Sequence, residues 1–493
     1  MQNEDASEPR PETGEHPAVG VFGPREKLAL GILLGTTFVV ILNETIMGVA
    51  TAVLMRELSI TAAEAQWLTT AYMLTMAIII PMMGLLIQRF STRALFAVAM
   101  AIFTVGTVVA AVAPGFEMLL IGRIVQAAGT AIMSPLLMTT VTTVAPPGKR
   151  GRLMSLVSIV FSVGPALGPP LSGFVLQWLS WRWLFIIILP IAVVTLIVGT
   201  WLMPSVGVRS NAKIDALSIV LATFAFGGVV YGLSAAGSAA VGVAALPAWM
   251  PLSVGVVALA LFIWRQLRLQ REDRALLDLR TFTSRPFRLT AIAFTISGVS
   301  LFGALFLIPL YAQNVLHFSP LLTGLIVLPG SLLGGVISPF VGRIIDRHGS
   351  RPPFIAGSII TAVSIWSMML FDVNTTIWQL FATNIVMNIG LSGIFTPLYA
   401  ISLGSLKPKL ASHGSATLST VSQLSGAAGT ALLVTVMTLV SVNHAGLALA
   451  ESPESVVAGI RMSFFVAAII TSLNVVIAFM IRDEPYRAPV KTR

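Results

Sequence analysis

The sequence predicts an all-α polytopic membrane protein with fourteen transmembrane spans. Hydrophobic residues make up 56% of the 493 positions and charged residues only 10%, whereas soluble domains carry about 25% charged residues. Apolar stretches of about 20 residues, the length that crosses a bilayer, recur along the chain between short polar segments. A bilayer accommodates this composition because lipid contacts the apolar side chains directly.

The apolar stretches define the spans in order. They are 28–50, 66–88, 94–113, 117–140, 153–176, 183–203, 216–236, 250–265, 287–314, 321–342, 353–371, 377–405, 414–442 and 461–481. Span 250–265 is the shortest of them. Since the number is even, both termini are expected on the same side of the membrane.

The distribution of Lys and Arg predicts which side that is. With both tails placed in the cytoplasm, 26 of the 30 bases lie in inner segments, as the positive-inside rule requires. The outer segments hold only Arg56, Arg182 and Arg461, and Arg123 lies within a span. We therefore expect a multi-pass protein of the cell (plasma or inner) membrane with cytoplasmic termini. Topology also accounts for the net charge of +10, so no nucleic-acid partner is expected.

Several kinds of site are excluded by residue type or spacing. The chain has no cysteine, which excludes disulfides and cysteine-ligated metals. None of the five histidines pairs with an acid at metal-ligand spacing, so neither a metal nor a cofactor is expected. Gly148-Lys149 lacks the earlier glycine and the following Ser or Thr of a phosphate-binding loop. The first 27 residues lack the basic region and apolar core of a signal peptide and are expected to form a disordered tail.

An internal repeat divides the chain into halves. The segment from Gly84 to Arg93 is similar to the segment from Gly342 to Arg351, and the same offset of 258 aligns Gly168 with Gly426. Such repeated halves are typical of secondary transporters, which bind substrate between the halves near the midplane. The predicted domains are a tail 1–27, a six-helix bundle 28–203, two extra spans with a basic loop 204–286, a six-helix bundle 287–481 and a tail 482–493.

Four short motifs follow one another in the predicted spans and loops. The cytoplasmic loop motif contains Gly84, Arg89 and Arg93, and its second copy contains Gly342, Asp346, Arg347 and Arg351. Span four carries a motif of the form R-x-x-Q-x-x-G from Arg123 to Gly129. Span five carries Gly164, Pro165, Gly168, Pro169 and Gly173, and span one carries Leu42-Asn43-Glu44-Thr45-Ile46.

In this order, the motifs resemble those of the major facilitator superfamily, and within it the fourteen-span drug:proton antiporters of the EmrB/QacA type, closest to lincomycin-resistance-type pumps. The resemblance covers nearly all of residues 28–481. It implies the major facilitator fold, two six-helix bundles plus two inserted helices, and assigns the span-five residues to an antiporter motif. This sequence differs from the family pattern at two places. These pumps commonly carry Asp where Asn43 stands, whereas the acid here is one position later, at Glu44. They also carry an acid at the place of Gln88, and here only the second copy of the loop motif keeps it, as Asp346.

Two charged residues fall deep inside predicted spans, Glu44 and Arg123. Each costs at least ~2.5 kcal/mol in hydrocarbon, so both should face the protein interior or a cavity. From the helical rise, Glu44 lies roughly 24 Å from the inner end of its span and Arg123 roughly 9 Å from the outer end of its own, which places them at similar depth. We interpret Glu44 as a proton carrier coupled to Arg123. The alternative is a permanent structural salt bridge.

Polar residues inside the spans are candidates for contacts with substrate. Gln126 and Thr130 follow Arg123 on the same helix face. The other candidates are Asn43, Thr45, Tyr311, Asn314, Asn384 and Asn388. The alternative is polar contacts that hold helices together.

Span five combines small residues with prolines. Gly164, Gly168 and Ser172 form a stripe that permits close approach of helix backbones, and the prolines bend the helix. The stripe is expected either to seal a seam between the halves or to pack a kinked helix.

These features together predict proton-coupled multidrug efflux. A monomer is expected to export amphiphilic neutral or monocationic compounds, with lincosamide-like antibiotics among them, in exchange for protons across the lipid bilayer. A lipid or metabolite exporter or an uptake symporter of the same fold is the alternative, because fold does not determine function. A membrane-embedded enzyme is disfavoured because no nucleophile-base arrangement is evident.

Overall fold

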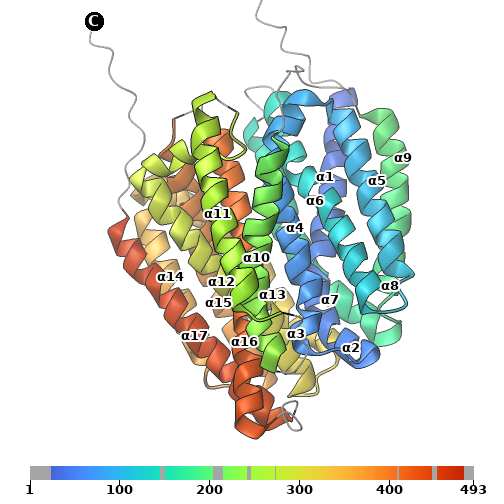
Figure 1. The fold of residues 1–493 in the computed structure, drawn as a ribbon, viewed down its shortest axis with the longest axis vertical. Coiled ribbons are helices and arrows are strands. Elements are labelled where there is room, and N and C mark those ends of the chain that lie inside the picture. The colour runs from blue at the N-terminus through green and yellow to red at the C-terminus, as the bar shows by residue number, and fades with distance from the viewer. Residues whose placement is uncertain are drawn as a thin grey trace, which may run out of the picture.

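The protein is a bundle of long helices that run in roughly the same direction (Figure 1). The computed structural model describes residues 24–144, 150–203, 215–240, 246–272, 274–407, 410–446 and 452–481. Most of the two predicted tails lies outside the described residues, as do Lys149, Arg209, Lys213 and Lys409. Within the described part every regular element is helical.

The described residues of the N-terminal half form nine helices. They are α1 (Pro24–Thr45), α2 (Met47–Leu58), α3 (Ala62–Ala65), α4 (Trp67–Arg89), α5 (Thr92–Ala111), α6 (Phe116–Val144), α7 (Arg150–Trp178), α8 (Trp183–Ile186) and α9 (Ile188–Leu202). Two more long helices, α10 (Ala216–Ala240) and α11 (Trp249–Leu269), form a hairpin. The short 3₁₀ helices η2 (Gln270–Glu272) and η3 (Leu279–Thr283) follow it.

In the C-terminal half, the part of the chain that the structure describes forms six helices. They are α12 (Arg285–Asn314), α13 (Pro320–His348), α14 (Arg351–Met368), α15 (Ile377–Gly404), α16 (Ala411–Ala445) and α17 (Pro453–Met480). The end of the bundle that carries the two loop motifs is called the Arg89 end below. The opposite end, with the α2–α3 corner, is called the Ser59 end.

Among the described residues, twelve helices are long and apolar enough to cross a membrane. The two other predicted spans coincide with α7 and α14, helices of 29 and 18 residues. Both pack along helices of the twelve, α7 against α1 and α13, and α14 against α15 and α17. The all-helical membrane fold is therefore confirmed, and the count of fourteen spans stays a prediction.

Helix ends differ from the predicted spans at several places. Span one is two helices broken at Ile46, where Thr45 Oγ1 donates to the carbonyl of Leu42 at 3.1 Å, a back-bond that tends to bend helices. The hairpin helix α11 is longer than predicted. The last helix begins at Pro453, so Arg461 lies inside α17 and not in an outer connection. Hydropathy marks the stretch that lipid covers, and helices continue past it.

The sequence repeat reappears in the packing of the two halves. Within the first half, a Cβ added at Gly168 of α7 would lie 3.0 Å from Thr45 Cβ of α1. Within the second, a Cβ added at Gly426 of α16 would lie 3.0 Å from Phe302 Cγ of α12. Each half thus packs the equivalent pair of helices together at an equivalent glycine.

The halves meet along α7 with α13 and α4 with α16. A Cβ added at Gly324 of α13 would lie 2.8 Å from Pro170 Cα, and one at Gly173 of α7 would lie 3.0 Å from Leu321 Cα. Both contacts lie toward the Ser59 end. The halves do meet at a close seam, but the span-five stripe follows its alternative, which is close packing within one half. Gly164 and Gly168 face α1 in their own half, because the helix presents Pro170 and Gly173 to the other half.

The α10–α11 hairpin lies across the junction of the halves (Figure 1). Gln66, between α3 and α4, donates from Nε2 to Ser234 Oγ of α10 at 2.5 Å. Thr435 of α16 donates to the carbonyl of Leu233 at 3.0 Å. The same turn of α10 is therefore hydrogen-bonded to both halves.

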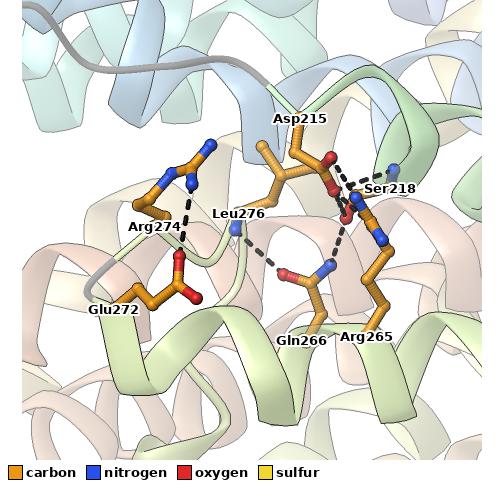
Figure 2. Close-up of polar contacts among 7 residues, drawn as sticks. All are labelled: Asp215, Ser218, Arg265, Gln266, Glu272, Arg274 and Leu276. Atoms are coloured by element: carbon orange, nitrogen blue, oxygen red, sulfur yellow. Dashed lines mark hydrogen bonds and ion pairs between the residues drawn. The ribbon is translucent and has the colours of Figure 1, made fainter.

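A polar cluster anchors the other end of the hairpin (Figure 2). Arg265 of α11 donates from Nε and Nη2 to the two carboxylate oxygens of Asp215 at 2.6 and 2.5 Å, and the Ser218 hydroxyl donates to the same carboxylate. Gln266 donates to Ser218 Oγ at 2.8 Å and accepts from the Leu276 backbone N–H at 2.9 Å. The cluster joins both hairpin helices to the segment that leads into α12.

Replacing Asp215 by Asn should destabilise the protein by about 1–3 kcal/mol at neutral pH, because Arg265 loses its bidentate partner. The hydrogen bonds from Arg265 lower the pKa of Asp215 from 3.8 to about 2. Their stabilising effect is therefore complete above pH 3.8 and is lost as the pH falls toward 2. The midpoint of thermal unfolding in detergent measures the loss.

The matched control for this prediction is Glu272→Gln. Glu272 pairs with Arg274 at 3.2 Å, with both side chains well exposed, and exposed pairs contribute little. Equal shifts of the midpoint for the two variants would contradict the anchoring role of Asp215.

Candidate functional site

A cavity of about 330 Å³ lies between the two halves. Helices α1, α2, α4 and α7 line it from one half, and α12, α13 and α15 from the other. Its apolar wall includes Met73, Phe161, Leu305, Phe302, Phe306 and Phe395. Its polar groups include Glu44, Thr45, Thr69, Ser331, Ser338, Asn388, Ser392 and Thr396. A mainly apolar wall with a few polar groups is suited to a small organic ligand.

Glu44 is the one ionisable side chain among the described residues that line this cavity. It occupies the last turn of α1, next to the break at Ile46. Gln423 of α16 donates from Nε2 to Glu44 Oε1 at 3.4 Å, which is long for a hydrogen bond. The carboxyl group is thus held from the opposite half by a weak contact, while it remains on the cavity wall.

Arg123 lies behind this wall and is completely buried. Its guanidinium carbon stands 4.0 Å from the ring centroid of Tyr72. It donates to the carbonyls of Leu68 at 3.4 Å and Asn43 at 3.3 Å, and to Gln126 Oε1 at 3.2 Å. No ion pair with Glu44 forms among the described residues, so the alternative of a structural Glu44–Arg123 salt bridge does not hold in this structure. Arg123 does contact the carbonyl of Asn43, the residue that precedes Glu44. The two charged residues therefore lie at similar depth, as the helical rise predicts.

Gln126 and Thr130 belong to the same buried network. Gln126 donates to Thr107 Oγ1 of α5 at 2.9 Å, and Thr130 Oγ1 shares a 2.6 Å hydrogen bond with the hydroxyl of Tyr72 on α4. Both side chains are fully buried and lie outside the cavity lining. They join α4, α5 and α6, as the alternative of polar contacts between helices describes.

Asn43 and Thr45 flank Glu44 in different ways. Thr45 lines the cavity. Asn43 is fully buried, and neither polar atom of its side chain has a partner among the described residues. Its carbonyl oxygen, by contrast, accepts the hydrogen bond from Arg123.

Of the four candidates in the second half, the structure places only Asn388 on the cavity wall. Asn388 donates to the carbonyl of Asn384 at 2.9 Å, and Asn384 is buried behind it. Tyr311 stacks on Phe371 with ring centroids 5.4 Å apart and donates to the carbonyl of Asp372 at 2.5 Å. Asn314 lines a different pocket, at the Ser59 end.

Sequence analysis missed several residues of this site. Gln423 was detectable as a polar residue within a predicted span. Phe302 is the repeat counterpart of Glu44 and lines the cavity with it. Tyr72 has no signal in the sequence, because its contact with Arg123 depends on how α4 and α6 cross.

The loop motifs lie at the Arg89 end. Arg89, Arg93, Asp346, Arg347 and Arg351 are exposed. Asp346 forms no ion pair with the described residues, whereas Arg351 donates to the carbonyl of Phe479 at 3.2 Å. Gly342 has open space around it. The surroundings of Gly84 and the side chain of Gln88 lie outside the described residues.

Two repeated helical halves around a central cavity define a secondary membrane transporter. The comparison with known families agrees, since residues 33–430 match the Major Facilitator Superfamily. The chain belongs to this superfamily, whose members are transporters and not enzymes.

Relatives of similar length extend the match over most of the chain. The MFS-type transporter YcnB of Bacillus subtilis is 42% identical over 459 residues, which is 93% of this chain and 95% of the relative. The lincomycin resistance protein LmrB of Listeria monocytogenes is 38% identical over 449 residues, covering 90% and 94% of the two chains. A protein of Mycobacterium tuberculosis named multidrug resistance protein B homolog is 28% identical over 418 residues, covering 83% and 77%.

Solved structures share the fold at low identity. A bacterial homologue of the human lysosomal transporter Spinster, in an inward-facing and unoccupied conformation, superposes with a TM-score of 0.66 at 14% identity, covering 94% of this chain and 97% of that one. The human organic anion transporter MFSD10 gives a TM-score of 0.61 at 13% identity, covering 92% and 100%.

Substitutions at Tyr72 should separate the two contacts of its side chain. Tyr72→Phe keeps the ring below Arg123 and should cost about 1 kcal/mol of stability for the lost hydrogen bond. Tyr72→Leu also removes the cation–π contact, worth about 2 kcal/mol when desolvated, and should cost about 3 kcal/mol. Thermal unfolding in detergent compares them.

Tyr231→Phe is the control for the Tyr72 variants, because the hydroxyl of Tyr231 has no hydrogen bond within the described structure. It should leave the unfolding midpoint unchanged. Equal losses for Tyr72→Phe and Tyr72→Leu would show that the ring does not stabilise the buried Arg123.

Proposed function

We propose that this chain exports amphiphilic neutral or monocationic compounds in exchange for protons. The observation that carries the proposal is the position of Glu44, an ionisable side chain on the wall of an otherwise uncharged cavity between two halves. A carboxyl group there either holds a proton or compensates the positive charge of a substrate, because an unpaired buried charge of either sign is costly. The proton and the substrate therefore compete for the same carboxylate, and binding of one releases the other.

The proposed cycle uses the weak contact between Glu44 and Gln423. When the two halves rock, α1 and α16 separate, and the carboxyl group loses its hydrogen-bond donor at the step in which the cavity changes sides. Arg123 stays in its buried network, and its positive charge favours release of the proton from Glu44 into the cavity. In this proposal, Arg123 tunes the proton carrier without pairing with it.

The orientation follows from the distribution of charges. We place the Arg89 end and both termini in the cytoplasm, because Arg89, Arg93, Arg343, Arg347 and Arg351 all lie there. The contacts of Gly173 and Gly324 then close the outer side. This placement fits the proposed fourteen-span topology, in which both termini lie on the same side of the membrane.

The names of the relatives support the substrate class. Lincomycin resistance and multidrug resistance proteins are expected to remove amphiphilic antibiotics, and the largely apolar wall with Thr69, Ser331 and Asn388 fits such compounds. We therefore infer lincosamide-like antibiotics as candidate substrates.

Glu44→Gln should abolish export driven by a proton gradient while binding of neutral substrate persists. Glutamine keeps the size and hydrogen-bonding capacity of the side chain but cannot release a proton. Inside-out vesicles with and without an imposed proton gradient measure transport, and binding to the solubilised protein measures affinity. Glu64→Gln is the matched control, since Glu64 caps α3 outside the cavity. Pumping by Glu44→Gln at the wild-type rate would exclude Glu44 as the carrier, and accumulation in the opposite direction would indicate an uptake symporter.

Dicationic compounds should be exported at least tenfold more slowly than monocations of similar size. The repeat counterpart of Glu44 is Phe302, and that of Arg123 is Phe381. The described residues of the second half therefore add no acid to the lining of the central cavity. One carboxylate compensates one charge, and aromatic rings recover only about 2 kcal/mol for a second one. A side-by-side export assay with mono- and dicationic dyes tests this. Efficient dication export that depends on Glu44 alone would refute the one-charge limit.

A further inference from the structure

A second cavity, the Ser59 pocket, lies between the halves at the Ser59 end. Its volume is about 590 Å³. The α2–α3 corner lines it from the N-terminal half, and the ends of α12 and α16 with the start of α17 line it from the C-terminal half. Met55, Met437 and Val456 give it an apolar wall, to which Thr438 and Gln313 add polar groups. It is separate from the central cavity that contains Glu44.

One hydrogen bond stands between the two cavities. Val49 of α2 lines the central cavity, and Gln313 of α12 lines the Ser59 pocket. Gln313 donates from Nε2 to the carbonyl of Val49 at 2.9 Å. Since α2 and α12 belong to different halves, separating the halves at this end breaks the bond.

The other polar atom of Gln313 is left without a partner. The side chain is only 1% exposed, and Oε1 is buried with no hydrogen-bond donor among the described residues. A buried acceptor in this state is costly, and a rotation of the side chain that turns Oε1 toward the pocket lets a donor there satisfy it. A hydroxyl or amide N–H group on a bound molecule supplies that donor.

Charge restricts which molecules remain there. Arg56 and His317 lie on the wall of the Ser59 pocket, and the described lining residues include no acid. A cation therefore finds no compensating charge, whereas a neutral amphiphile meets apolar walls and the acceptor of Gln313.

We propose that the Ser59 pocket is a second binding station for neutral amphiphiles that carry hydroxyl or amide donors, and that Gln313 both recognises the donor and separates this station from the central cavity. The proposal rests on the proposed export function and adds a station on the release side of the path. Cations pass this station without being held, and neutral compounds pause at it.

Single introduced cysteines test the proposal, because the chain contains no cysteine of its own that a maleimide would label. Ala62→Cys reports on the Ser59 pocket and Leu305→Cys on the central cavity. Chloramphenicol, a neutral compound with hydroxyl and amide donors, should slow maleimide labelling of both positions in solubilised protein. Adding Gln313→Met should weaken protection at Ala62→Cys about tenfold and leave protection at Leu305→Cys within twofold. Gln177→Met makes the same substitution at an exposed glutamine of α7 outside both cavities, so it is the matched control and should change neither.

The separating role of Gln313 has its own measurement. In intact cells, a membrane-impermeant maleimide added outside should label Leu305→Cys several times faster when Gln313→Met is present, and no faster with the control Gln177→Met. Protection at Leu305→Cys without protection at Ala62→Cys would overturn the second station, as would protection at Ala62→Cys that Gln313→Met leaves intact. Labelling measures occupancy without transport, so failure of proton coupling in the Glu44 test does not affect these outcomes.

Discussion

The absence of water from the bilayer core determines where the charged groups of this chain lie. A charged side chain inside a span must find polar partners within the protein or face a cavity. The two charges predicted deep in the spans satisfy this requirement differently. Arg123 is buried over the Tyr72 ring with carbonyl and amide acceptors around it, and Glu44 reaches the cavity wall. The first arrangement fixes three helices in place, and the second leaves a carboxyl group able to exchange its proton or its partner.

The sequence repeat gives the two halves similar helix packing, although the charges that they contribute to the cavity differ. Equivalent glycines, Gly168 and Gly426, bring equivalent helices together in the two halves, yet one half contributes Glu44 to the cavity and the other contributes Phe302. The halves are therefore alike in backbone packing and different in charge. In the proposed exchange, a change in the charge state of Glu44 acts on its own half and on its contact with Gln423 of the other half, and it thereby couples protonation to the relative position of the halves.

The sequence predicted the helical membrane fold, the repeat and the neighbourhood of Glu44 and Arg123, because each follows from hydropathy, from an offset or from the helical rise. It did not predict which face of a helix meets the other half. Gly164 and Gly168 looked suited to the seam, but Pro170 and Gly173 lie in it, and Tyr311 is held by Phe371 and Asp372 away from the cavity. Arg461 was placed in a loop because hydropathy does not detect where a helix continues beyond lipid. Rotations of helices about their axes depend on long-range packing, which a single sequence does not encode in any local pattern.

Three sets of contacts join the two halves, and they differ in strength. In the proposed cycle, the weaker contacts break first when the halves move relative to each other. The seam of α7 and α13 is backbone against backbone at Gly173 and Gly324, so small displacements cost packing at once. The hairpin contacts of Gln66 and Thr435 with α10 are single hydrogen bonds beside an extensive apolar surface, and its far end is fixed by the Asp215–Arg265 pair. Gln313 to Val49 and Gln423 to Glu44 are single hydrogen bonds next to cavities. In the proposed cycle, rocking of the halves therefore breaks the bonds beside the cavities at little cost, and the hairpin, which contacts both halves, limits how far they separate.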